Sequence, residues 1–168
     1  KGILADEIIS KEQVLQKSKF KNTINCAEVL SNELEPIKGR VHVIQVIPGK
    51  LITKALVRNH DDLGVARLSV LERYGHRSKP ANGYVYGFGN QFKGAIASSV
   101  GHDSHNLCCV GTSSKDMATA MNVIRNQGGG FAVVKDAKVL AELALPFGGL
   151  MTAASPKEIE KKIKNLRE

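Results

Sequence analysis

Residues 40–75 show a pattern of apolar and polar positions that predicts three β-strands. The β-branched run RVHVIQVIPG, residues 40–49, is followed at once by LITKALVRN, residues 51–59, so we expect two strands joined by a tight turn. From residue 65 the apolar and polar positions alternate with period two, as in a strand with one buried face. This alternation places Ala66, Leu68 and Val70 on the buried face and Arg67, Ser69 and Arg73 on the polar face.

Shorter strands are expected in the glycine-rich stretch that follows. HRSKPANG, residues 76–83, has the composition of a loop. GYVYGFGNQFKGAIASSVG, residues 83–101, predicts short strands interrupted by glycines, with one face formed by Tyr84, Tyr86 and Phe88. NLCCVGT, residues 106–112, predicts a further strand because it is apolar and bounded by polar residues.

Helix and hairpin signals alternate in the last third of the chain. Ser113 or Ser114 is suited to cap a helix that ends at Gly128, with an apolar stripe of Met117, Ala120, Met121 and Ile124. Residues 130–145 predict a hairpin that turns at Asp136. A final helix is predicted by an N-cap, first-turn proline and capping box at Ser155, Pro156 and Glu158, and by a stripe of Ile159, Ile163 and Leu166.

These elements predict a single α+β (mixed α/β) domain, in which two to three helices flank a mixed sheet. Residues 1–38 are expected to form a polar, partly helical segment, because Ser10 with Gln13 and Asn25 with Glu28 are potential helix-capping pairs. Residues 39–168 are expected to form the α+β domain itself.

Composition narrows the class of protein. The net charge is +8, but the basic residues are scattered and aromatic residues make up only 5%, so we favour solvated faces over a nucleic-acid surface. No apolar run approaches the ~20 residues that a membrane helix needs, and no signal peptide is evident, so we expect a cytoplasmic protein. Cys26, Cys108 and Cys109 are expected to be buried, reduced thiols, without a disulfide or a structural zinc site. The chain does not begin with methionine, and we expect it to be part of a longer protein.

The stretch GHDSHNLCCVG holds the densest group of reactive side chains, namely His102, Asp103, Ser104, His105 and Asn106. Histidine titrates near neutral pH and a neighbouring aspartate can fix its tautomer, which favours a functional loop, called here the HDSHN loop. In the alternative, the loop is structural: its polar groups bind backbone amides and its histidines pack against neighbours. A metal site formed by His102, Asp103 and His105 is less favoured, because ligand spacing in a loop is permissive.

Three other motifs leave alternatives open. The triple glycine at residues 128–130 lacks the context of a phosphate-binding loop and favours a helix end that runs into a strand with close backbone packing. LPFGGLM, residues 145–151, forms either a tight turn near a partner or substrate, or a plain connection between the last strand and the last helix. Asp61 and Asp62 make a poor acid–base pair, because adjacent side chains on an extended chain point apart.

Several of these blocks, in this order, resemble the C-terminal domain of bacterial and archaeal adenine deaminases of the amidohydrolase-superfamily type. The resemblance covers residues 40–166 and is strongest in AIASSVGHDSHN, in the triple glycine and in LPFGGLM. It implies a hydrolase that converts adenine and water to hypoxanthine and ammonia in purine salvage. It also implies manganese or iron in a (β/α)8 barrel that precedes this domain, where the metal would activate a water molecule.

The histidines of this chain do not form an amidohydrolase ligand set. We therefore expect no metal in this part of the protein and no activity from it alone. The resemblance makes His102, Asp103 and His105 candidate catalytic contributors, and Ser104 and Asn106 candidate substrate-binding residues, offered by this domain to the active site of the barrel. Homo-oligomerisation is also expected. The alternative is a non-catalytic interaction or oligomerisation module in which the HDSHN loop is purely structural.

Overall fold

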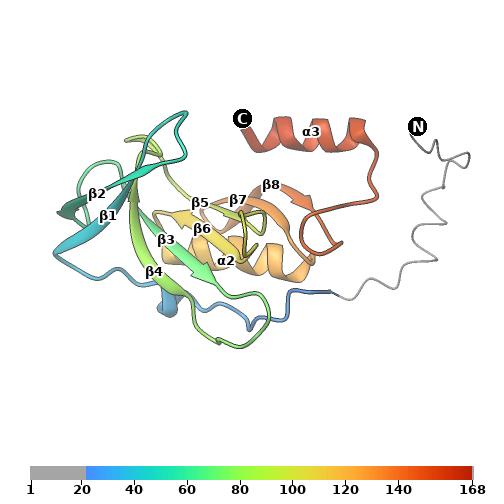
Figure 1. The fold of residues 1–168 in the computed structure, drawn as a ribbon, viewed down its shortest axis with the longest axis horizontal. Coiled ribbons are helices and arrows are strands. Elements are labelled where there is room, and N and C mark those ends of the chain that lie inside the picture. Colours follow the sequence, from blue (N-terminus) through green and yellow to red (C-terminus); the bar gives the residue numbers. More distant parts are fainter. Residues whose placement is uncertain (1–21, 168) are drawn as a thin grey trace, which may run out of the picture.

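The computed structural model describes residues 22–167, which fold around one mixed sheet (Figure 1). The strands are β1 (Arg40–Val46), β2 (Thr53–Asn59), β3 (Val65–Leu71), β4 (Ala81–Tyr86), β5 (Ala95–Ser98), β6 (Leu107–Gly111), β7 (Gly130–Lys135) and β8 (Lys138–Ala144). The helices are the 3-10 turn η1 (Ser31–Leu34) and the α-helices α2 (Ser114–Asn126) and α3 (Pro156–Arg167). No helix among these residues is long and apolar enough to cross a membrane.

The strand order β2-β1-β4-β3-β6-β5-β7-β8 confirms the predicted mixed sheet of an α+β domain. Neighbouring strands are antiparallel except for β1 and β4, which pair in parallel. The first two strands pair as predicted, and residues 47–52 between them contain the predicted tight turn, in which the Lys50 amide donates to the Ile47 carbonyl at 3.1 Å. Two α-helices flank the sheet in residues 22–167.

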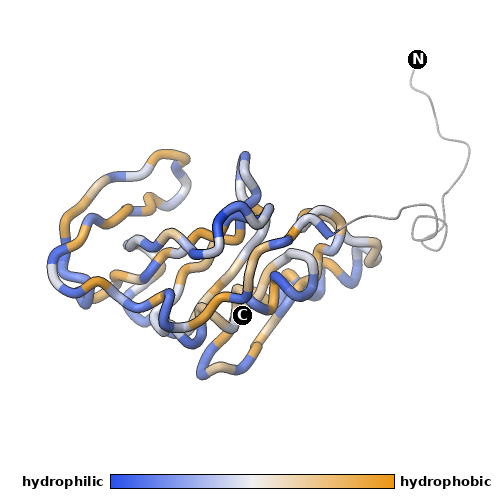
Figure 2. The backbone as a smooth tube through the Cα atoms, turned by 90° about the horizontal axis from the view of Figure 1, so that it is seen from below, coloured by the Kyte–Doolittle hydropathy of each residue, from blue (hydrophilic) through white to orange (hydrophobic). Residues whose placement is uncertain are grey.

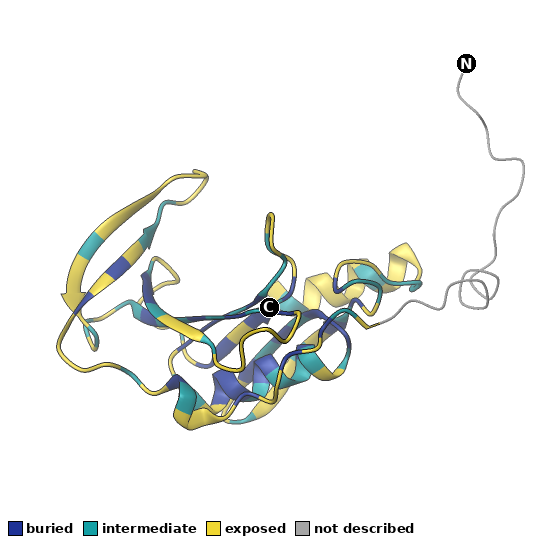
Figure 3. Cartoon of the chain, turned by 60° about the horizontal axis from the view of Figure 1, so that its bottom comes forward, coloured by how far each residue is buried: buried dark blue, intermediate teal, exposed yellow. Residues whose placement is uncertain are grey.

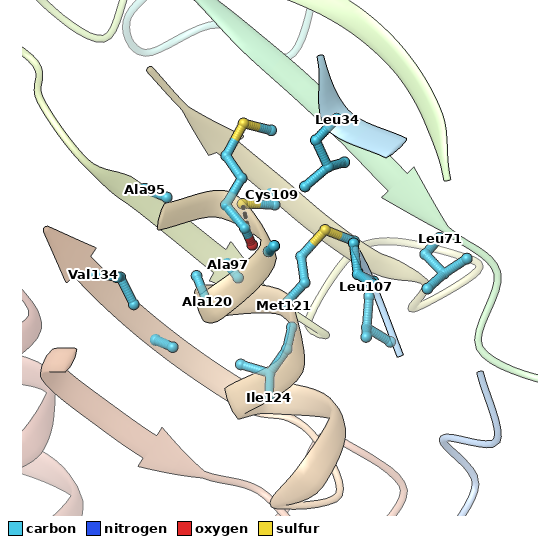
Figure 4. Close-up of a cluster of buried hydrophobic side chains, with 14 of the residues drawn as sticks. Leu34, Leu71, Ala95, Ala97, Leu107, Cys109, Ala120, Met121, Ile124 and Val134 are labelled. Carbon is cyan, nitrogen blue, oxygen red and sulfur yellow. Dashed lines mark hydrogen bonds between the residues drawn. The ribbon is translucent and has the colours of Figure 1, made fainter. Parts of the chain in front are cut away.

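Helix α2 covers one face of the sheet and forms the main core (Figure 4). Its predicted cap is Ser113, whose hydroxyl oxygen accepts a hydrogen bond from the Asp116 amide at 3.4 Å. The predicted apolar stripe is completely buried, namely Met117, Ala120, Met121 and Ile124. It packs against alternate residues of the strands beneath it, including Ala97, Cys109 and Ala132.

The segment before β1 closes the other side of α2. It places four buried side chains in the same core, Ile24, Cys26, Val29 and Leu34. The backbone of Val29 exchanges two hydrogen bonds of 2.9 Å with the Asn122 side chain on α2. The predicted capping pair of Asn25 and Glu28 is wrong, because residues 22–30 contain no helix and the Asn25 amide donates to the Arg73 carbonyl at 2.8 Å. The pair of Ser10 and Gln13 lies outside the described residues, and the division at residue 38 stays a prediction.

The predicted hairpin at residues 130–145 and the predicted final helix are both confirmed. β7 and β8 turn through Asp136 and Ala137, whose φ angles of 52° and 58° are those of a two-residue hairpin turn. Helix α3 begins with the predicted capping interactions between Ser155 and Glu158. It packs against β8 at the edge of the sheet (Figure 1).

The predicted strand at Tyr84 and Tyr86 is confirmed as β4, but β4 begins earlier than predicted. The expected loop at residues 76–83 contains its first residues, because Ala81 and Gly83 pair with Val70 and Leu68 of β3. Pairing with a neighbouring strand overrides a local composition that is typical of loops. Phe88 does not continue the face of Tyr84 and Tyr86, since β4 ends at Tyr86 and Phe88 lies in the following loop, 5.9 Å from the ring of Phe92.

The prediction of a polar, outward face for β3 is also wrong. Ser69 and Arg73 are 1% and 3% exposed, because this face of β3 turns toward the α2 side of the sheet. Each of these side chains has hydrogen-bond partners within the protein: the Ser69 hydroxyl donates to the Asn82 side-chain oxygen, and Arg67 donates to the Leu34 carbonyl, both at 2.6 Å. A regular polar–apolar alternation therefore does not require a solvated face when internal acceptors are available.

Candidate functional site

The HDSHN loop connects β5 to β6 and is closed by its own backbone. The His105 amide donates to the Gly101 carbonyl at 2.9 Å, and the Gly101 amide donates to His105 Nδ1 at 3.3 Å. His105 has a positive φ of 50°, a conformation that non-glycine residues adopt mainly in tight turns. The loop is therefore a defined turn, in which the His105 ring accepts a bond from the loop itself.

The tip of the loop is open to solvent. His102 Nδ1 and Asp103 Oδ1 lie 2.8 Å apart, and their side chains are 93% and 89% exposed. Ser104 beside them is exposed as well. The aspartate carboxylate contacts an imidazole that no other part of the described chain covers. This arrangement can hold or move a proton at His102, or bind a polar ligand brought to the loop.

The base of the loop is tied to Arg73, in the connection that follows β3. The Asn106 side-chain oxygen accepts from the Arg73 amide at 3.3 Å, and the Arg73 guanidinium donates to the His105 carbonyl at 3.0 Å. His105 and Asn106 are half-buried by these contacts. The five candidate residues thus divide into an exposed tip of three and an anchored base of two.

Arg73 links this base to the LPFGGLM segment. Its guanidinium also donates to the Gly148 carbonyl and to the Thr23 hydroxyl, and its Nε has no hydrogen-bond partner within residues 22–167. The segment is a turn in which Phe147 and Met151 form a β-bridge, and it connects β8 to α3. That this turn lies near a partner or substrate stays a prediction. A single buried guanidinium therefore joins three separate parts of the chain.

Ser99 ties the triple glycine to the same cluster. Its hydroxyl accepts from the Gly130 amide at 2.7 Å and donates to the Gly149 carbonyl at 2.6 Å. The glycines follow the end of α2 and lead into β7 with close backbone packing, as predicted: a β-carbon on Gly129 would lie 2.3 Å from the Gly149 α-carbon. The three sequence blocks that carry the family resemblance therefore meet at one end of the sheet.

The sequence patterns do not identify Arg73 and Ser99, the two residues that hold this cluster together. The period-two pattern predicts Arg73 on the polar face, and it gives no signal for Ser99. One signal was available for Arg73, because it lies two residues after Leu71 and so continues the row of β3 that faces α2. An arginine that continues such a row needs several internal acceptors, and backbone carbonyls of turns supply them here.

The candidate residues do not assemble a metal site within the described chain. No group of three His, Cys, Asp or Glu side chains in residues 22–167 is placed to hold a metal ion. His102 and Asp103 bind each other, whereas the His105 ring accepts the Gly101 amide. Asp61 and Asp62 do not act together either: Asp62 accepts the Asn59 amide at 3.1 Å, whereas Asp61 lies 3.6 Å from His60.

The cysteines are free thiols, of which Cys26 and Cys109 are buried and Cys108 is half-buried. Burial raises the pKa of the Cys109 thiol far above its usual range, and burial also raises the pKa of Cys26 and Cys108. Because a buried thiolate is disfavoured, the buried pair is expected to resist oxidation and alkylation in the folded protein.

We expect the free energy of unfolding to fall as the pH rises above about 8.5, the ordinary pKa of an unfolded thiol. The raised thiol pKa keeps the folded state protonated there, while the unfolded state loses the proton, so the stabilisation present at lower pH is lost. Each pH unit removes up to about 1.4 kcal/mol per buried thiol. Urea unfolding at pH 7 and pH 9.5 measures this slope, and Cys109→Ala should flatten it; an unchanged slope in the variant would contradict the assignment.

The fold and the anchored loop define an α+β domain that presents an exposed polar tip from a fixed base. Its family is shown by comparison with known proteins: residues 45–168 match the adenine deaminase C-terminal domain, and the chain belongs to this family. The adenine deaminase of Brucella anthropi is 37% identical over 99% of the chain. Adenine deaminase 1 of Rhizobium johnstonii is 45% identical over 78% of the chain, and the adenine deaminase of Shewanella halifaxensis is 42% identical over 87%. The chain spans only 33%, 25% and 26% of the lengths of these relatives.

Proposed function

We propose that the chain is the C-terminal accessory domain of a metal-dependent adenine deaminase, which converts adenine and water to hypoxanthine and ammonia in cytoplasmic purine salvage. The observation that carries this proposal is the family match over residues 45–168. Relatives that match over nearly the whole chain are named adenine deaminase and are about three times as long. The domain therefore works as one part of a larger enzyme.

The catalytic metal, manganese or iron, belongs in this proposal to a (β/α)8 barrel of the amidohydrolase type in the rest of the protein. Residues 22–167 do not fit the metal, because they bring no three suitable ligands together. The metal supplies an activated water when bound. We accordingly expect this chain alone to deaminate no adenine.

The HDSHN loop is the part of the domain that we assign to the active site. The side chains of His102, Asp103 and Ser104 are exposed, so their polar groups are available to adenine or to the metal-binding side chains of the barrel. His105 and Asn106 have partners within the domain, the Gly101 amide and the Arg73 amide, and so anchor the base of the loop. An anchored base with a free polar tip suits a residue that must meet a substrate at a fixed distance.

In the full-length enzyme, Asp103→Ala is expected to lower the turnover of adenine by roughly 10- to 100-fold, the range for residues that orient the groups of a metal site. The Asp103 side chain is almost fully exposed and bonds only to His102 among the described residues, so folding stability should change little. Ammonia release measures turnover, and thermal unfolding measures stability.

Asp61→Ala is the matched control, because Asp61 is also an exposed aspartate beside a histidine, in a loop on another part of the domain. It should leave turnover unchanged. Equal turnover of the Asp103→Ala enzyme and the control would assign the HDSHN loop a structural role. A full-length protein that does not deaminate adenine would overturn the proposal as a whole.

A further inference from the structure

The sheet has a second apolar face, on the side opposite α2. The apolar residues of this face pair across neighbouring strands. Ile44 of β1 pairs with Val85 of β4, which pairs with Ala66 of β3. On the next strands, Leu68 of β3 pairs with Val110 of β6, which pairs with Ile96 of β5. The row ends with Val133 on β7 and Ala141 on β8. On the inner strands β4, β3, β6, β5 and β7, the only polar side chains of this face are Ser98 and Lys135. We call this surface the α2-free face.

An antiparallel sheet with one solvated face normally carries polar residues on that face. Here the composition is that of a buried surface, yet Ile44 on β1 is 45% exposed and Ile96 on β5 is 36% exposed. Ala66, Val85 and Val110 are already buried in the domain, with Phe92 packed against them, so the uncovered part of the face lies around Ile44 and Ile96. In the described chain α2 contacts the sheet from the other side and α3 packs at the β8 edge, so neither helix closes the remainder.

Two segments of the chain rise on the same side of the sheet as the α2-free face. Figure 3 shows α2 beneath the sheet, whereas the β1–β2 hairpin and the loop between β5 and β6 rise on the opposite side. Figure 2 shows orange segments beside pale and blue ones at the tip of that hairpin, and Leu51 and Ile52 in it are strongly exposed. The HDSHN loop therefore rises on the same side as the uncovered apolar surface.

We propose that the α2-free face is the surface on which the remainder of the same adenine deaminase chain packs. The relatives are about three times as long as this chain, so a large body of polypeptide is available to cover it. A face almost free of charge on its inner strands suits a permanent interface within one chain. The inference rests on the proposed function, and it adds that one docking event buries the face and brings the HDSHN loop to the rest of the enzyme.

The test places single thiols on the face of the full-length protein. Ile96→Cys and Ile44→Cys lie on the α2-free face, and Ile37→Cys lies on an exposed apolar position before β1 as the matched control. Under native conditions the two face thiols are expected to react with iodoacetamide roughly tenfold more slowly than the control, because the interface must open first. Mass spectrometry separates these sites from the native cysteines. Equal rates at all three positions would overturn the proposal.

A benzophenone maleimide attached to the face thiols during refolding identifies what covers them. Crosslinks to residues outside the 168 residues of this chain, in a product of single-chain mass, are the expected result. A product of doubled mass, or crosslinks confined to this domain, would assign the face to a second copy or to the domain itself and overturn the proposal. Adenine deamination is measured in parallel: unprotected thiols in an active enzyme refute only the docking, whereas protected thiols in a protein without deaminase activity refute only the proposed function.

Discussion

Replacing Gly130 by alanine is expected to destabilise the folded state severely. A β-carbon at this position would lie 1.8 Å from the Leu143 carbonyl oxygen, and the φ of +124° disfavours any L side chain. Relief would require β7 and β8 to separate where Gly130 pairs with Ala144. We expect a loss of about 4 kcal/mol or more in the free energy of unfolding, a large share of the stability of a typical domain. Urea unfolding followed by circular dichroism measures it.

Gly49→Ala is the matched control for Gly130→Ala. Gly49 also has a positive φ, of +71°, but a β-carbon there has no described atom within 4 Å. This variant should lose only the backbone term, about 1–2 kcal/mol. A similar loss in the two variants would show that β7 and β8 adjust to the added carbon and that the close packing of the triple glycine is not essential.

Arg73→Ala is expected to destabilise the protein by about 2–4 kcal/mol, because it removes a buried guanidinium and leaves the carbonyls of the half-buried His105 and Gly148 without their donor. The loss should be greatest at the site: the His105 amide, which closes the HDSHN loop, should exchange with solvent much faster. Hydrogen exchange read by mass spectrometry tests this local effect, and urea unfolding tests the total.

Arg73→Lys should recover only part of this stability, since one ammonium group cannot reproduce the planar fork that reaches both loops. Arg77→Ala, an exposed arginine in the same β3–β4 connection, is the control and should change stability by less than about 0.5 kcal/mol. Unchanged exchange of the His105 amide in Arg73→Ala would mean that the loop holds its conformation without the guanidinium.

Local signals predicted the elements whose causes lie within a few residues of one another. The cap at Ser113 and the four-residue stripe of α2 are such a case, and so is the turn at Asp136, where a short polar residue adopts a positive φ. The capping box of Ser155 and Glu158 is a third. The hydrogen-bond partner in each case is two to four positions away, so these capping and turn patterns can be recognised in the sequence.

The sequence by itself also determined the family, through the order of AIASSVGHDSHN, the triple glycine and LPFGGLM. Only the tertiary structure decided that these blocks meet, because Arg73 and Ser99 join groups about 30 to 75 positions apart. The start of β4 depends in the same way on pairing with β3. The burial of Ser69 depends on the segments that cover the α2 side of the sheet. A hydrogen bond between distant segments produces no periodic pattern of residues in either segment. The contacts that anchor the HDSHN loop can therefore be found only in the folded structure.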